Sequence, residues 1–149
     1  MNDYLADEKK PSDEYMASHW EAARDEVRNL VNLPTNWDGE GADPFRENLI
    51  SPTFSLLLHA ERCHFPPPTN IYLTASGTAM VEWHFANGYA VIANVRESNH
   101  AEIIYRYCDG RKPEFQRIEL EESTKPTIVA PLLCDPPSCL DDEFYHLAA

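Results

Sequence analysis

The sequence predicts an α+β domain in which two N-terminal helices pack on an antiparallel β-meander of four to five strands, followed by an extended C-terminal strap. Apolar residues recur every three or four positions before residue 64, and they alternate with polar residues between positions 70 and 120. Short turn signals separate the alternating segments. Parallel strands need long crossover connections, so consecutive strands joined by short turns predict an antiparallel sheet.

The chain has 149 residues, a length for which one domain is the default. Residues 1–11 are polar and charged without an apolar period, and we expect a flexible lead-in. Residues 12–120 form the single α+β domain. Residues 121–149 are acidic, contain four prolines and show no sustained period, and we expect them to form a strap or tail.

The first helix is predicted over residues 12–33. Ser12 suits an N-cap, acids follow it in the first turn, and Pro34 ends the helix. One face carries an apolar stripe at helical spacing, made of Met16, Trp20, Ala23, Val27, Leu30 and Val31.

The second helix is predicted to begin at Ser51, with Pro52 at the first helical position, and to run to about Cys63. Residues 66–68 are three consecutive prolines that end it. Between the two helices lies a loop over residues 33–44, which holds two of the five glycines of the chain.

Strands are predicted over residues 70–74, 79–85, 89–95, 101–107 and 115–120, and Asn87-Gly88 is a hairpin signal. One face of this sheet is apolar and is the expected site of helix packing. The other face carries Met80, Ile92 and Ile104, so both faces hold apolar residues. We expect either the C-terminal strap or another protein to cover the second face.

The formal net charge is −13, and it is unevenly distributed. Residues 1–50 carry −7 and residues 119–149 carry −6, whereas residues 51–118 are neutral. This distribution argues against direct binding of nucleic acid or of an anionic membrane, both of which call for a basic surface. No apolar run reaches the length of a membrane span, and the N-terminus does not resemble a secretory signal, so we expect a cytoplasmic protein. Acidic ends either keep the domain in solution or attract a basic partner.

The segment Asn36-Trp37-Asp38-Gly39-Glu40-Gly41-Ala42 after the first helix, together with Gly77 to Trp83, resembles a group of small bacterial proteins. These proteins carry a "WDG-x-GA" segment after a first helix and a later strand of the form "G-x-x-x-x-E-W". The resemblance covers residues 20–108, and Glu40 stands where that group usually has an aromatic residue. It implies the fold and a bacterial or phage origin, and it brings no established activity, substrate or cofactor.

The loop after the first helix is the first candidate site. Asp38, Glu40 and Asp43 could bind a hard cation, but their spacing does not match the EF-hand pattern. In a second interpretation the loop is a structural turn anchored by Trp37. In a third, Trp37, Asp38, Glu40 and Asp43 contact a partner, together with Trp83 on the sheet.

The cysteines and histidines match no motif of a metal site or a nucleophilic enzyme. Cys63, Cys108, Cys134 and Cys139 lack the paired spacing of a structural zinc site, and we expect free thiols rather than disulfides. We therefore expect no metal, and because the chain has no glycine-rich phosphate loop we also expect no nucleotide or other cofactor. The alternative catalytic set is His84 with Glu82 and Arg106, which the alternation places on one sheet face.

Two classes of function remain. The first is a non-enzymatic protein-interaction module of the antitoxin or inhibitor type, with an acidic surface that binds a basic protein partner or a second copy of the chain. The second is a small hydrolase or nuclease-like enzyme that uses His84 and Glu82.

Overall fold

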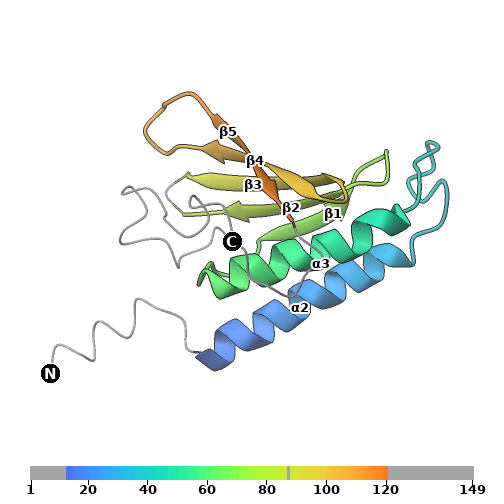
Figure 1. Ribbon diagram of the computed structural model, residues 1–149, viewed down its shortest axis with the longest axis horizontal. Coiled ribbons are helices and arrows are strands. Elements are labelled where there is room, and N and C mark those ends of the chain that lie inside the picture. The colour runs from blue at the N-terminus through green and yellow to red at the C-terminus, as the bar shows by residue number, and fades with distance from the viewer. Residues whose placement is uncertain (1–12, 87, 121–149) are drawn as a thin grey trace, which may run out of the picture.

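The computed structural model describes residues 13–86 and 88–120, and it shows two helices packed on a five-stranded antiparallel sheet (Figure 1). Helices α2 (Asp13–Val31) and α3 (Glu47–Arg62) lie side by side on one face of the sheet. The strands are adjacent in the order of the chain. They are β1 (Asn70–Leu73), β2 (Ala79–His84), β3 (Ala90–Glu97), β4 (His100–Arg106) and β5 (Glu114–Glu119). The predictions for residues 1–11, for Ser12 and for residues 121–149 lie outside the described residues.

Helix α2 presents the predicted apolar stripe to the core, except for Val31, which is 41% exposed at the end of the helix. Trp20, Ala23 and Val27 are buried, and Met16 and Leu30 pack against them from the edge. The helix ends at Val31, two residues before the predicted end, and the next two amides donate to carbonyls three residues back. This tighter hydrogen-bond pattern is typical of a last helical turn.

Helix α3 begins at Glu47, so the predicted start at Ser51 is wrong and Pro52 lies inside the helix. The backbone of Arg46 is extended, and its amide donates to the carbonyl of Gly77 over 3.1 Å. The earlier turn buries Leu49 completely. Burying a leucine contributes about 1.5–3 kcal/mol. A proline inside a helix costs about 3 kcal/mol, so the burial of Leu49 offsets much of this cost.

The sheet alternates as the sequence predicts. From β2 to β4, the residues on the helix-facing side are buried; they are Ala79, Val81, Trp83, Val91, Ala93, Val95, Ala101, Ile103 and Tyr105. In β5, Ile118 continues this side, whereas Phe115 points away from it and is 75% exposed.

We call the side of the sheet opposite the two helices the open sheet face. The strand register aligns Glu82 with Ile92, Ile92 with Ile104, and Ile104 with Phe115. These four residues therefore form one row across four strands, and no described helix covers them (Figure 1). The ladder between β3 and β4 shifts register between Asn94 and Glu97, which marks a β-bulge.

The two described cysteines differ. Cys108 is free, as expected, but Cys63 is disulfide-bonded, so the expectation of free thiols is wrong for this residue. Cys134 and Cys139 lie outside the described residues.

Candidate functional site

The loop over residues 36–43 is a closed turn built from its own polar groups. Asn36 has a positive φ of 62°, its amide donates to the carbonyl of Ala42 over 2.7 Å, and its side-chain oxygen accepts from the Gly41 amide over 2.6 Å. The Asp38 carboxylate accepts from the amides of Glu40 and Ala42. These two backbone hydrogen bonds lower the pKa of Asp38. The loop therefore holds a defined conformation through hydrogen bonds of its own.

The same loop is fixed to the turn between β1 and β2. The Asp43 amide donates to the carbonyl of Ala75 over 2.8 Å, and the Trp37 indole donates to the carbonyl of Asp43 over 2.9 Å. Gly77 has a φ of 82°, and a Cβ at this position would lie 2.4 Å from the carbonyl oxygen of Pro44. Only glycine fits there. The contacts agree with the interpretation of a structural turn that leaves Asp38, Glu40 and Asp43 exposed.

Trp83 is a core residue and lies apart from this loop. It is 0% exposed, its indole N–H donates to the carbonyl of Pro66 over 2.7 Å, and its ring meets Phe65 edge to face. A side chain in this position is not available to a partner on the surface, so Trp83 takes no further part in the candidate interface.

Glu82 and His84 are in contact on the open sheet face. The His84 Nε2 and Glu82 Oε1 atoms lie 2.8 Å apart, and the Tyr72 hydroxyl on the neighbouring strand donates to the other carboxylate oxygen over 2.6 Å. Only 14% of the Glu82 side chain is exposed. We call Tyr72, Glu82 and His84 the β2 cluster.

The β2 cluster shifts the pKa of two of its members. Burial alone would raise the pKa of Glu82, but the hydrogen bonds from Tyr72 and His84 outweigh it, and the pKa is lowered. The hydrogen bond to Glu82, with a smaller contribution from burial, raises the pKa of Tyr72 to about 12. The carboxylate is thus held ionised, and the phenol is held protonated.

Arg106 lies on the same face but two strands away from His84. It is aligned with Ala90, which in turn is aligned with His84. Among the described residues, Arg106 forms no ion pair with Glu82 or His84. The structure therefore brings together two of the three residues in the predicted catalytic alternative.

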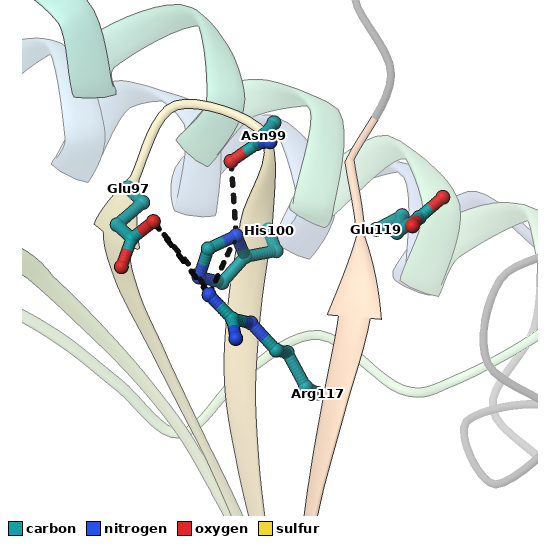
Figure 2. A pocket seen from close by; sticks show the side chains of 5 residues that line it. All are labelled: Glu97, Asn99, His100, Arg117 and Glu119. Atoms are coloured by element: carbon teal, nitrogen blue, oxygen red, sulfur yellow. Dashed lines mark hydrogen bonds and ion pairs between the residues drawn. The ribbon is translucent and has the colours of Figure 1, made fainter.

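A second polar cluster, which the sequence did not predict, lies on the open sheet face where β3 turns into β4. It surrounds a depression with a volume of about 370 Å³. Figure 2 shows that the lining residues come from this turn and from β5. They are Glu97, Asn99, His100, Arg117 and Glu119, and we call them the turn cluster.

His100 is at the centre of the turn cluster, and its side chain is only 8% exposed. Its Nδ1 atom lies 2.9 Å from the side-chain oxygen of Asn99. Its Nε2 atom contacts Nη2 of Arg117 and lies 3.2 Å from Oε2 of Glu97 (Figure 2). One ring nitrogen therefore faces both a cation and an anion.

The comparisons with known proteins assign no family. A scan of family models, a search of curated proteins and a search of solved structures each returned no match. Within the described residues, no group of three or more His, Cys, Asp or Glu side chains is placed to hold a metal ion. None of the described helices is long and apolar enough to cross a bilayer.

Proposed function

We propose that this chain is a non-enzymatic protein-interaction module that binds a protein partner on the open sheet face. The observation that carries the proposal is the apolar part of the row across the sheet. Ile92 and Ile104 are half-buried in the middle of the sheet, and the row ends at Phe115, which is 75% exposed on strand β5.

A single exposed apolar residue needs no explanation, but an aligned set does. Met80 and Tyr72 lie in the adjacent row of the same face, and Tyr72 is 41% exposed. Burying one phenylalanine side chain contributes about 1.5–3 kcal/mol, so Phe115 is the strongest anchor that this face offers. Strand β5 is also the last strand of the sheet, where the backbone of an edge strand can pair with another chain.

Charge at one end of the sheet supports a partner that is basic on one side of its apolar centre. The ordered loop at 36–43 presents Asp38, Glu40 and Asp43 at the β1–β2 turn. The turn cluster adds Glu97 and Glu119 at the same end of the sheet, because Ala79 after the β1–β2 turn is aligned with Val95. An acidic end of this kind favours association with a basic surface through electrostatic steering. A basic target of an antitoxin or inhibitor is the class of partner that we propose for this face, whereas the resemblance implies only a bacterial or phage origin.

The proposal is tested by placing a photo-crosslinking amino acid at Phe115 in cells of the source organism. The matched control places the same group at Tyr15, which is 48% exposed on helix α2. We expect a single defined adduct from position 115 and none from position 15. The captured protein is then purified, and Phe115→Ser is expected to weaken its binding by at least tenfold. Equal labelling at both positions, or unchanged binding of Phe115→Ser, would contradict the proposal.

The alternative is a small hydrolase or nuclease-like enzyme, and the 2.8 Å contact between His84 and Glu82 favours it. A carboxylate that orients an imidazole is a common arrangement for a general base. The test is a screen of ester, peptide and phosphodiester substrates with the wild type and with His84→Ala. An activity that is lost in His84→Ala while the circular dichroism spectrum is retained would establish the enzyme and refute the non-enzymatic module.

A further inference from the structure

We infer that His100 controls the position of Arg117 through its own protonation. In the neutral state the imidazole holds the guanidinium against the β3–β4 turn, and in the protonated state it releases the guanidinium and keeps Glu97 instead. The inference concerns the turn cluster alone and does not depend on the identity of a partner.

The contacts of His100 with Asn99 and Arg117 fit the neutral imidazole, and its contact with Glu97 fits the protonated one. The side-chain oxygen of Asn99 can only accept a hydrogen bond, so Nδ1 of His100 donates to it. In a neutral ring the other nitrogen then carries a lone pair. A guanidinium has only donors, so Arg117 Nη2 donates to Nε2 of His100. The same Nη2 atom also lies 3.3 Å from Nδ1, so the guanidinium is held against the ring of a side chain that is only 8% exposed.

A proton taken from solvent turns Nε2 of His100 from a hydrogen-bond acceptor into a donor. The protonated nitrogen has no lone pair to accept from Arg117, and a guanidinium stays charged at all ordinary pH values. Two cations in contact repel each other. The Glu97 carboxylate already lies 3.2 Å from Nε2 and becomes its hydrogen-bond acceptor. The proton therefore places His100 in competition with Arg117 for Glu97, whose Oε2 also lies 3.6 Å from Nη2 of Arg117, and adds repulsion between the two cations.

The other charged groups around His100 allow this exchange. Glu119 on β5 is aligned with His100 and lines the same depression. Arg117 is 63% exposed, so it can move without disturbing the core. Its aligned neighbour on β4 is Glu102, which pairs with Arg96 over 3.3 Å. Glu102 is thus a second carboxylate beside Arg117 on the open sheet face, in addition to Glu97, whose Oε2 lies 3.6 Å from Nη2 of Arg117.

The inference is tested by following the Nε–H signal of Arg117 by NMR between pH 5 and 8, together with the ring signals of His100. We expect the Arg117 signal to shift with the same midpoint as His100 in the wild type. The shift should be absent in His100→Gln. It should persist in His84→Gln, which removes the other histidine of the open sheet face.

Two results would overturn the inference. One is an Arg117 signal that does not change while His100 titrates in the wild type, a result that needs no variant. The other is a shift of the same size in His100→Gln. If His100→Gln does not fold, Glu97→Gln supplies the second measurement, because the signals of Arg117 and His100 are expected to keep one common midpoint in this variant. Midpoints that separate in Glu97→Gln would refute the coupling.

Discussion

Two histidines on the open sheet face each contact a glutamate, but the burial of the two partners is reversed. In the β2 cluster, 33% of the His84 side chain is exposed and Glu82 is 14% exposed. In the turn cluster, His100 is 8% exposed and Glu97 is 61% exposed. The distances between the histidine nitrogen and the glutamate oxygen are similar, at 2.8 and 3.2 Å.

The difference shows how burial decides the role of a polar pair. A covered carboxylate stays charged and needs donors, which Tyr72 and His84 supply to Glu82. A buried imidazole can stay neutral and accept a hydrogen bond, as His100 does. The charges of the turn cluster then lie on exposed groups, Glu97 and Arg117. The β2 cluster is therefore expected to contribute to stability, whereas the turn cluster responds to protons.

The largest expected effect is on stability. Glu82→Ala removes the acceptor shared by Tyr72 and His84, and we expect the free energy of unfolding to fall by about 1–2 kcal/mol. The matched change Glu97→Ala removes an exposed carboxylate and is expected to stay within about 0.5 kcal/mol of the wild type. Urea unfolding at pH 7 measures the free energy of unfolding of both variants. Equal losses in the two variants would contradict the distinction between the clusters.

The second effect is the acid dependence of stability. The pKa of Glu82 is lower in the folded chain than its ordinary value, so its contribution is present above the unfolded-state pKa of about 4.3. The contribution is lost as the pH falls through the folded pKa. We therefore expect the wild type to lose more stability than Glu82→Gln between pH 6 and pH 3. Parallel pH profiles for the two proteins would show that Glu82 does not titrate as proposed.

The third effect is spectroscopic. The Tyr72 phenol, held by Glu82, has its pKa raised to about 12. The difference in phenolate absorbance between the wild type and Tyr72→Phe should therefore appear with a midpoint near this value. In Glu82→Gln the midpoint should move toward 10, the ordinary value for tyrosine. Because the folded pKa is raised, the associated stability is present below about pH 10 and is lost as the pH rises through about 12. An unchanged midpoint in Glu82→Gln would show that Glu82 does not raise the pKa of Tyr72.

The fold could be predicted because burial imposes a period on the sequence. The alternation around Val81 and Trp83 predicted both the strand and its inner face, and the structure confirms them. The start of α3 could not be predicted in the same way. Ser51-Pro52 has the local pattern of a helix start, but the burial of Leu49 and the hydrogen bond from Arg46 to Gly77 decide the boundary. Both are tertiary interactions.

The β2 cluster and the turn cluster also differ in how far the sequence alone could predict them. His84 and Glu82 are two residues apart on one strand, and period two alone places them on one face. His100 and Arg117 are 17 residues apart and meet only through the register between β4 and β5. The bulge between Asn94 and Glu97 also positions the turn. The sequence did contain one signal for the turn cluster. A histidine stands directly after a predicted turn, and the next strand along the chain carries an arginine.

The smallest expected effect concerns Arg106, which shares a sheet face with His84 but does not contact it. Arg106 lies on the face of His84 but two strands away, which corresponds to about 9–10 Å at the usual strand spacing. That separation is close to the Debye length at physiological ionic strength, so the guanidinium is largely screened from His84. We expect Arg106→Gln to change the free energy of urea unfolding at pH 7 by less than about 0.5 kcal/mol, whereas Glu82→Gln lowers it clearly. A large effect of Arg106→Gln would return this arginine to the cluster and would strengthen the enzymatic alternative.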